Sequence, residues 1–342
     1  MRVLLTGGTG FVGCHTAAAL LTAGHELRLL VRSLDRVAPA LEPLGVDPGD
    51  VEAVAGDATD PASVRAAAAG RDATLHAAAV YSLDPRRAGE VTRVNAAAAE
   101  TVLRAAAEAG HDPVVHVSSY AALLPRTSAA PLDGDAPVGA VTLPYAGSKA
   151  ASEIVARGLQ AEGAPVAITY PGMVWGPDDP HLGETSRIAM AALAGRLPAL
   201  PPGIAPVSDV RDVAAVHAAL MAPGRGGRRH VASGENLPLV EIMRTAVRVT
   251  GRRLPVVAVP AGAAAVAGRL GQALGRIGLD LLPAREATWI ASQDGPADPG
   301  GAIRDLGVAF RPAADSIRDT VRWLHAAGHL SARRAGALAQ PA

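Results

Sequence analysis

Short runs of apolar residues alternate with longer amphipathic stretches through the first half of the chain. The runs are rich in valine and leucine and predict buried strands at Arg2–Leu5, Glu26–Val31, Val51–Val54, Ala73–His76, Pro113–Val117 and Val166–Tyr170. The stretches between them have helical spacing and cover Val12–Ala23, Pro61–Ala68, Ala88–Ala109 and Pro144–Glu162. Apolar strands that are each followed by a helix are typical of a parallel sheet with helices on both faces. The pattern therefore predicts an α/β fold built on a doubly wound sheet.

The alternation weakens in the second half, where clusters of proline and glycine mark loops. We expect residues 1–172 to form the main domain, with residues 205–235 returning to it. Residues 173–204 and 236–330 are expected to form a smaller C-terminal substrate lobe. Chain ends are often loosely held, and we expect residues 331–342 to be frayed.

Composition excludes several classes of partner. The chain has 342 residues and a formal net charge of zero, so neither a nucleic acid nor an anionic membrane surface is expected to bind it. Its one cysteine, Cys14, rules out an intrachain disulfide and favours a reducing compartment. No segment has the length of a signal peptide core or a membrane span, so we expect a cytoplasmic location. The histidines lack the spacing of metal ligands, and no metal site is expected.

The first predicted strand leads directly into a glycine-rich turn. Its glycines fit two registers, Gly8-x-Gly10-x-x-Gly13 and Gly7-x-x-Gly10-x-x-Gly13. Glycines at such positions permit a tight turn, let the backbone approach a pyrophosphate and let the following helix pack on the strand. The N-terminus of that helix attracts phosphate. We therefore predict a Rossmann-type dinucleotide site whose contacts here are Gly7, Thr9, Gly10, Phe11, Val12 and Gly13.

The residue that ends the second strand indicates which dinucleotide binds. An acid at this position accepts from the ribose of NAD, whereas this chain has Arg32, which can hold a 2′-phosphate. NADP(H) is therefore favoured over NAD(H). Two alternatives stay open: Asp35 lies close enough in sequence to reach a ribose, and Arg32 can be an ordinary surface cation.

Tyr145 and Lys149 carry the sharpest chemical signal. They are spaced i and i+4 on a predicted helix, so both side chains lie on one face. Lys149 is the only lysine in the chain, while every other cation is arginine. A nearby ammonium favours the phenolate of a tyrosine, and the same ammonium can bind the ribose hydroxyls beside the nicotinamide. The pair predicts a proton-transfer site, with a surface pair on an amphipathic helix as the alternative.

A hydroxyl is expected to hold the substrate oxygen beside this pair. The predicted strand Pro113–Val117 ends in Ser118 and Ser119, and ligands of open α/β sheets bind at the carboxyl ends of the strands. Ser119 is the first choice and Ser118 the second. The predicted catalytic residues are thus Ser119, Tyr145 and Lys149.

These residues resemble the short-chain dehydrogenase/reductase superfamily, in particular its extended branch. The branch carries Thr-Gly-x-x-Gly-x-x-Gly, matched by residues 6–13, and Tyr-x-x-x-Lys, matched by Tyr145 to Lys149. The chain is most similar to the NAD-dependent epimerase/dehydratase family, including members like dihydroflavonol reductases and hydroxysteroid dehydrogenases. The resemblance implies a homodimer. It also implies further cofactor contacts at Asp57, Ala58, Ala77, Ala78, Ala79, Asn95, Pro171 and Val174.

Three smaller interpretations accompany the resemblance. Asp212 lies in a stretch that recurs in the family and is interpreted as a helix cap. Tyr81 and Trp175 are candidate walls of a substrate pocket, with core packing as an equal alternative. Ser119 is followed by Tyr120 and Ala121 where sugar dehydratases of the branch carry acids, which argues against dehydration.

The sequence therefore favours an NADP(H)-dependent oxidoreductase that reduces a ketone or aldehyde, or oxidises the alcohol, by hydride transfer. The first alternative is an epimerase of nucleotide sugars or related substrates, which oxidises and re-reduces its substrate without net redox. The second is a dinucleotide-sensing protein without catalysis. The residues do not identify the substrate, and the apolar character of the C-terminal third favours a hydrophobic carbonyl.

Overall fold

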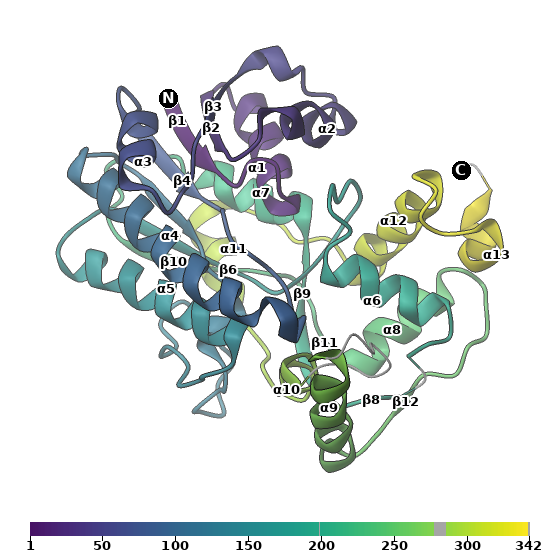
Figure 1. Cartoon of the computed structure of the whole chain (residues 1–342). Coiled ribbons are helices and arrows are strands. Elements are labelled where there is room, and N and C mark those ends of the chain that lie inside the picture. The colour runs from purple at the N-terminus through teal and green to yellow at the C-terminus, as the bar shows by residue number, and fades with distance from the viewer. Residues whose placement is uncertain (198, 277–284, 341–342) are drawn as a thin grey trace.

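A seven-stranded parallel sheet forms the centre of the larger part of the molecule (Figure 1). The computed structural model describes residues 1–197, 199–276 and 285–340. The strand order is β10-β6-β5-β4-β1-β2-β3, and the chain reverses direction across the sheet between β1 and β4. The strands are β1 (Arg2–Thr6), β2 (Glu26–Val31), β3 (Val51–Ala55), β4 (Ala73–His76), β5 (Val114–Val117), β6 (Val166–Pro171) and β10 (Arg228–Ala232). The predicted doubly wound α/β fold is confirmed.

Helices cover both faces of this sheet because successive strand residues point to opposite sides. Val3 and Leu5 of β1 pack into the core on one face, whereas Leu4 packs into the core on the other. The first face carries α1 (Phe11–Thr22), α2 (Val37–Leu41) and α7 (Val210–Ala219). The second carries α3 (Pro61–Ala68), α4 (Ala88–Glu108) and α5 (Pro144–Ala161). Short 3-10 turns are η1 (Leu34–Arg36), η2 (Glu42–Leu44), η3 (Pro48–Asp50), η4 (Pro85–Arg87), η5 (Tyr120–Leu123) and η6 (Gly336–Ala339).

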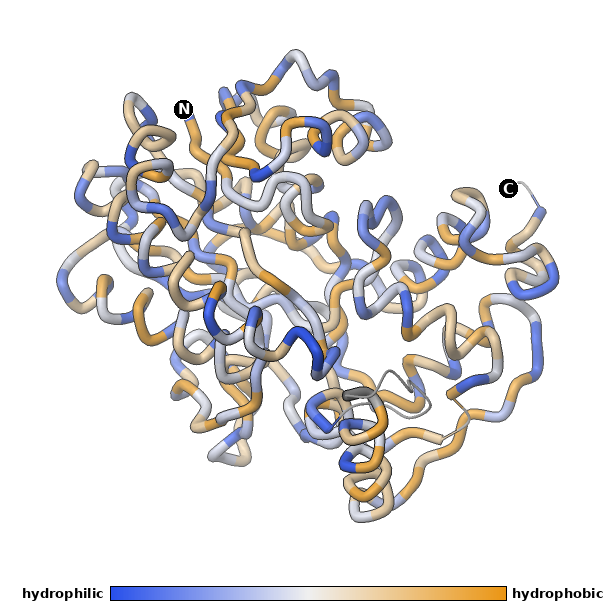
Figure 2. Tube along the Cα trace, in the orientation of Figure 1, coloured by the Kyte–Doolittle hydropathy of each residue, from blue (hydrophilic) through white to orange (hydrophobic). Residues whose placement is uncertain are grey.

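A second lobe lies beside the carboxyl ends of the sheet and has its own apolar core. Its strands are β7 (Met173–Trp175), β9 (Ile204–Asp209) and β11 (Asn236–Pro238) in one sheet, and β8 (Ala199–Leu200) and β12 (Val257–Ala258) in another. Its helices are α6 (Glu184–Leu193), α8 (Leu239–Arg248), α9 (Ala261–Arg276), α10 (Arg285–Ala291), α12 (Ala313–Ala326) and α13 (Ala332–Ala335). Helix α11 (Gly300–Leu306) instead packs on β10 and α7 of the main body. In Figure 2 the most apolar segments follow the strands of the main sheet and stretches of the lobe.

Two boundaries differ from the expectation. Within residues 205–235, β10 joins the main sheet and α7 packs against it, but β9 pairs with β7 and β11 in the lobe. Residues 332–339 are not frayed. They form α13 and η6, where Ala335 is fully buried and the Ala337 N–H donates to the Thr250 carbonyl at 2.9 Å. Only 341–342 of that segment lie outside the described residues. The C-terminal segment is held because apolar side chains of α13 and η6 pack against α12.

Candidate active site

The glycine-rich turn between β1 and α1 is constrained by close backbone contacts. Gly7 has φ +79°, and a Cβ there would lie 2.6 Å from the Ala77 carbonyl carbon. A Cβ on Gly13 would lie 1.9 Å from the Gly7 carbonyl oxygen. By contrast, a Cβ on Gly8 would meet the flexible side chain of Leu29 first. Gly7 and Gly13 therefore carry the steric demands of the turn, and of the two positions that distinguish the registers, Gly7 is more tightly constrained than Gly8.

The N-terminus of α1 is open to a negatively charged group. Gly10 is the N-cap, makes no side-chain cap and is followed by a first turn without an acid. The free N–H groups of that turn, from Phe11 to Gly13, carry the partial positive charge that attracts phosphate. Thr9, just before the cap, is only partly buried. These residues fit the pyrophosphate of a dinucleotide.

A cation and an acid meet at the ends of β2 and β3. Arg32 is exposed, and within the part of the chain that the structure describes its guanidinium makes no hydrogen bond or ion pair. Asp57 accepts from the N–H and the hydroxyl of Thr59, both at 2.8 Å, and these bonds followed by the charge of Arg32 hold its pKa below the usual range. Ala58 follows it in a partly buried turn. Asp35 is exposed and accepts from the Ser33 hydroxyl.

The loop after β4 lies against the glycine turn. The Ala77 N–H donates to the Thr6 carbonyl at 3.1 Å, and Ala77 and Ala78 are the residues that Gly7 approaches. Ala78 and Ala79 keep side chains that fill little space beside the turn. This edge is therefore lined by backbone, as a dinucleotide site requires.

Asn95 in α4 is buried and bonded on both sides of its amide. Its Oδ1 accepts from the Val80 N–H at 2.7 Å, and its Nδ2 donates to the Val80 carbonyl at 3.0 Å and the Ser148 hydroxyl at 2.9 Å. Both donors of the amide are used. In this structure Asn95 fastens the loop after β4 to α5, and it does not face the dinucleotide site as a free group.

Ser119, Tyr145 and Lys149 come together at the carboxyl ends of β5 and β6. Ser119 is close enough to the Tyr145 phenol to lower its pKa, and Lys149 Nζ donates to the Val117 carbonyl at 3.2 Å. Lys149 is 6% exposed, whereas Tyr145 is partly exposed. The Ser118 hydroxyl, the second choice, is buried without a partner among the described residues. The geometry thus favours Ser119 over Ser118.

Burial dominates the electrostatics of this group. It raises the pKa of Tyr145 to about 12, with the Ser119 side chain lowering it and the charge of Glu286 raising it. It lowers the pKa of Lys149 to about 8, and the carboxylate of Glu153 opposes that change. Desolvation of the phenol is thus the largest influence on the pKa of Tyr145. That Lys149 favours the phenolate beside a nicotinamide stays a prediction.

Two neutral histidines lie beneath Lys149. His76 and His116 are cross-strand neighbours on β4 and β5, with ring centroids 5.6 Å apart and planes 13° apart. The Thr6 hydroxyl bonds His76 Nδ1 at 2.7 Å. Burial, followed by the charge of Lys149, lowers the pKa of His76 to about 3. His76 is therefore uncharged at neutral pH beside the lysine cation.

The segment that joins the main sheet to the lobe passes beside the site. Pro171 is the last residue of β6. Val174 of β7 pairs with Ser208 of β9. Between them, a Cβ on Gly172 would lie 2.2 Å from the Pro206 carbonyl oxygen, so the crossing is tightly packed. Pro171 and Val174 therefore lie where the two parts meet.

The two candidate pocket residues, Tyr81 and Trp175, have different surroundings in the structure. Tyr81 is 46% exposed and its ring centroid lies 4.6 Å from that of Tyr145, so it borders the site. Trp175 is fully buried in the core of the lobe and is a packing residue. Asp212 is not a cap: Asp209 accepts from the first turn of α7, while Asp212 pairs with Arg311.

Glu286 is the contact that the sequence did not indicate. Its Oε1 accepts from the N–H groups of Tyr145 at 2.8 Å and Ala146 at 2.9 Å. It lies on α10 in the second lobe, 141 residues from Tyr145. A single acid so far away in sequence belongs to no local motif that could have predicted the contact.

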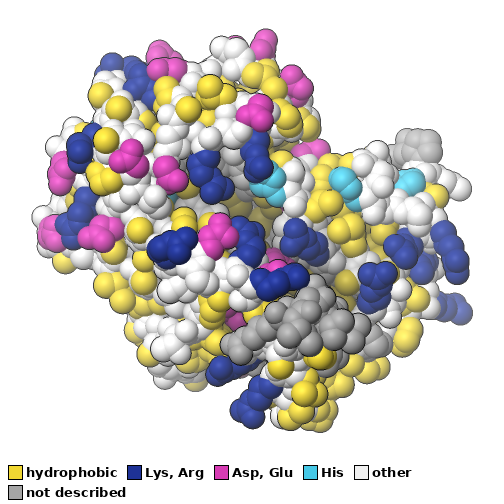
Figure 3. Space-filling view, viewed as in Figure 1, with side chains coloured by type: hydrophobic (Ala, Val, Ile, Leu, Met, Phe, Trp, Pro, Cys, Tyr) yellow, Lys and Arg dark blue, Asp and Glu magenta, His cyan; other side chains and the backbone are white. Residues whose placement is uncertain are grey.

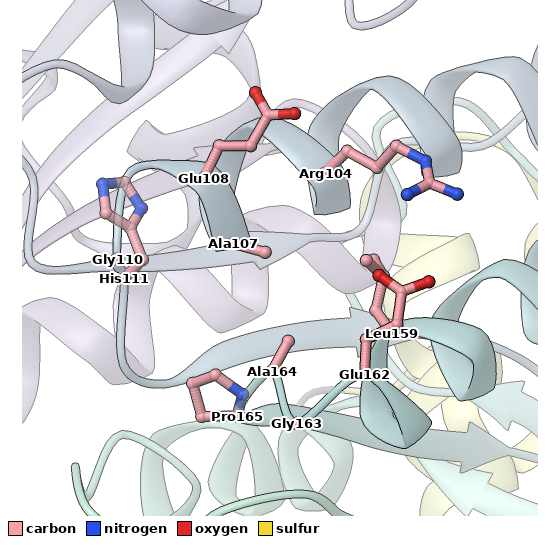
Figure 4. A pocket seen from close by; sticks show the side chains of 10 residues that line it. All are labelled: Arg104, Ala107, Glu108, Gly110, His111, Leu159, Glu162, Gly163, Ala164 and Pro165. Carbon is pink, nitrogen blue, oxygen red and sulfur yellow. The ribbon is translucent and has the colours of Figure 1, made fainter.

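A separate hollow between α4 and α5 lies at the other edge of the sheet (Figure 4). It is lined by the ends of both helices and by the segments that enter β5 and β6, including His111 and Pro165. Ligands of such sheets bind at the carboxyl edge, so this hollow is not the candidate site. Figure 3 shows a notch between the main body and the lobe, with arginine and acidic side chains beside it.

Metal-ligand clusters and membrane-spanning helices are both absent from the described residues. Across the described residues, no three histidine, cysteine or acidic side chains are grouped as metal ligands. In the same residues, each helix is too short or too polar to cross a lipid bilayer.

Comparison with known proteins identifies the family. The profile of the NAD dependent epimerase/dehydratase family matches residues 3–231, and the chain belongs to that family. It is 27% identical over 335 residues to a putative dihydroflavonol 4-reductase of Synechocystis, covering 95% of each chain. It is 28% identical over 341 residues to a 4-hydroxy-2-methyl-3-oxo-4-farnesyl-3,4-dihydroquinoline-1-oxide ketoreductase of Stigmatella aurantiaca, covering 96% of this chain and 98% of the other.

A solved structure extends the likeness to the whole fold. The crystal structure of gox2253 superimposes with a TM-score of 0.79 at 28% identity, covering 96% of this chain and 99% of the other. The chain is accordingly an NAD(P)-binding enzyme of the extended short-chain dehydrogenase/reductase type.

Proposed function

We propose that the chain is an NADP(H)-dependent carbonyl reductase in which Tyr145 protonates the substrate oxygen. The observation that carries this proposal is the 3.2 Å hydrogen bond from Lys149 Nζ to the Val117 carbonyl, which brings the helix of Tyr145 and Lys149 to the strand end that Ser119 follows. All three lie at the carboxyl edge of the sheet, next to the glycine turn. The names of the two full-length relatives, a 4-reductase and a ketoreductase, support the same reaction class.

Each residue has a distinct task in this reaction. The glycine turn would hold the reduced dinucleotide, which would supply the hydride. Ser119 and Tyr145 donate hydrogen bonds to the carbonyl oxygen, and Tyr145 transfers its proton as negative charge develops there. Lys149 holds the ribose of the dinucleotide and keeps a positive charge near the phenol. General acid catalysis of this kind contributes about 10²- to 10⁴-fold.

The protonation of Tyr145 supports reduction over oxidation. A pKa of about 12 keeps the phenol protonated at neutral pH, and a protonated phenol is the form that a proton donor needs. Oxidation of an alcohol would need the phenolate, which burial disfavours. The exposed ring of Tyr81 beside Tyr145 supports a substrate with an apolar body.

Arg32 supports NADP(H) as the cofactor. Arg32 directly follows β2, where a ribose phosphate is bound in this fold, and its exposed guanidinium has no partner among the described residues. A charge-assisted hydrogen bond contributes about 1.5–3 kcal/mol, so Arg32→Asp should lower the preference for NADPH over NADH by about 10- to 100-fold. An unchanged ratio would remove Arg32 as the selector.

The deciding experiment begins with the dinucleotide that freshly purified protein releases on denaturation, identified by mass spectrometry. An exchangeable site, empty or partly filled with NADP(H), is expected; stoichiometric NAD and no net NADPH consumption would favour the epimerase instead. NADPH oxidation is then measured with hydrophobic ketones and aldehydes. Tyr145→Phe should abolish turnover while NADPH affinity stays within about threefold, and full turnover in that variant would overturn the proposal.

A further inference from the structure

Helix α5, which carries Tyr145 and Lys149, begins without a cap of its own. Its N-cap, Leu143, offers no side-chain acceptor, and the first turn contains no acid. Pro144 has no N–H, so the next orphan donors are the N–H groups of Tyr145 and Ala146. The proposed proton donor therefore stands in the part of a helix that frays most readily unless an acceptor is supplied from elsewhere.

The second lobe supplies that acceptor. Glu286 Oε1 accepts from both N–H groups, at 2.8 and 2.9 Å, and its side chain is 6% exposed. A carboxylate at this end of a helix also interacts favourably with the helix dipole. Burial raises the pKa of Glu286, while the two N–H bonds lower it.

We propose that Glu286 is a positioning residue, which holds the first turn of α5 so that the Tyr145 phenol stays against Ser119. The inference rests on the proposed function, in which Tyr145 is the proton donor. It makes full turnover depend on docking of α10, and therefore of the second lobe, against the catalytic helix. The two parts of the molecule then share the assembly of one site.

The position of α10 is itself fixed by close packing. A Cβ on Gly268 of α9 would lie 2.6 Å from Thr288 Oγ1, and a Cβ on Gly203 would lie 2.1 Å from the Ala291 carbonyl oxygen. Further along, the Leu132 N–H donates to the Pro296 carbonyl at 2.7 Å, which ties the segment after α10 to the main body. The carboxylate of Glu286 is thus presented by a helix that is held from several sides.

Two substitutions separate bonding from mere bulk. In Glu286→Ala the acceptor of both hydrogen bonds is lost, whereas Glu286→Gln keeps a side-chain oxygen that can accept from the same N–H groups. We expect Glu286→Ala to lower kcat by about 10- to 100-fold, the range set by misplacement of a catalytic group by about 1 Å. KM for NADPH should change by less than about twofold, and Glu286→Gln should recover most of kcat.

Amide hydrogen exchange of the peptide spanning residues 143–149 gives a second measure that does not depend on turnover. Exchange should be faster in Glu286→Ala than in the wild type and close to the wild type in Glu286→Gln. Glu241→Ala serves as the matched control, because Glu241 pairs with Arg248 at the surface of the same lobe. It should change neither kcat nor the exchange of this peptide.

The outcomes separate the two proposals. Full turnover of Tyr145→Phe would overturn the proposed function. Loss of turnover in Tyr145→Phe together with wild-type kcat and exchange in Glu286→Ala would overturn the role of Glu286 alone. If Glu286→Ala does not fold, Glu286→Asp replaces it, since shortening the side chain by one methylene draws the acceptor away from the helix; wild-type kcat there would likewise overturn the inference.

Discussion

The main body and the second lobe are held together by different kinds of contact. In the main body each strand pairs with neighbours in a continuous parallel sheet, and the dinucleotide turn lies within the first 13 residues. The lobe assembles β7, β9 and β11 from distant segments, and helices α6, α8 and α12 cover them. The main body therefore holds the residues proposed for chemistry, while the lobe adjusts them through Glu286. The difference shows that one site can depend on both a local motif and remote packing.

The largest effect is expected from breaking the local motif of the main body. In Gly13→Ala the new Cβ would overlap the Gly7 carbonyl oxygen at 1.9 Å, and because both groups belong to the backbone, the turn must open. We expect NADPH affinity to fall by at least about 100-fold, since the N–H groups at the start of α1 then no longer point toward the pyrophosphate. Fluorescence titration with NADPH measures the change.

Gly158→Ala is the matched control for that variant. Gly158 lies on the exposed side of α5 with no neighbouring atom within 4 Å of a new Cβ. Alanine is a better helix former than glycine, so stability should rise by about 0.5–1 kcal/mol with NADPH affinity unchanged. Wild-type affinity in Gly13→Ala would show that the turn does not hold the dinucleotide.

The next effect concerns the charge of Lys149, which belongs to the main body alone. Burial lowers its pKa to about 8, so the amine is a cation below that pH and neutral above it. Turnover should therefore fall by up to about tenfold per pH unit above pH 8, while the phenol of Tyr145 stays protonated throughout. The pH dependence of kcat/KM between pH 6 and 10 measures this limb.

Substitution of Glu153 tests the direction in which the pKa of Lys149, and with it the descending limb of the pH profile, moves. Its carboxylate raises the pKa of Lys149, and it bonds Arg157 and the Tyr170 phenol. Glu153→Gln keeps an acceptor for both but removes the charge, so the descending limb should move to lower pH. A limb that moves upward, or turnover that stays flat to pH 10, would contradict the assignment to Lys149.

These features of the main body are the ones that the sequence predicted well. Buried parallel strands are apolar on both faces, so β1 to β6 stand out as short apolar runs. Tyr145 and Lys149 meet because four positions make about one helical turn, a rule that needs no tertiary information. Ser119 follows from its place at the end of a strand.

The lobe was predicted less well because its contacts join residues far apart in sequence. Nothing near Glu286 marks it as the acceptor for the first turn of α5. Trp175 has the same sequence character whether it lines a pocket or fills a core. Apart from Leu338, residues 332–339 are small or charged, and their docking depends on the surface that α12 presents rather than on their own pattern.

A smaller effect is expected when the lobe is disturbed away from the site. In Gly268→Ala the Cβ would lie 2.6 Å from Thr288 Oγ1, which must shift α10 and with it Glu286. We expect kcat to fall several-fold, with NADPH affinity unchanged, because the glycine turn is untouched. A Cβ on Gly262 of the same helix has no neighbour within 4 Å among the described residues, so Gly262→Ala should leave kcat as it is. Equal kcat in the two variants would separate the lobe from the catalytic helix.

The smallest effect on turnover is expected at the docked end of the chain. Gly336 has φ +57°, and a Cβ there would lie 2.1 Å from the Thr250 carbonyl oxygen. Gly336→Ala should therefore lower the free energy of unfolding by about 1–3 kcal/mol and leave kcat unchanged at temperatures below the transition. Gly328→Ala has a similar backbone strain, at φ +79°, but no neighbour within 4 Å, so it should be the less destabilised of the two. Thermal unfolding of both variants compares the effect of backbone strain alone with the effect of strain plus the contact with the Thr250 carbonyl. Equal Tm values would mean that the end is held by its backbone conformation alone, whereas a lower Tm in Gly336→Ala would show that packing against Thr250 stabilises the lobe, even though the chemistry takes place in the main body.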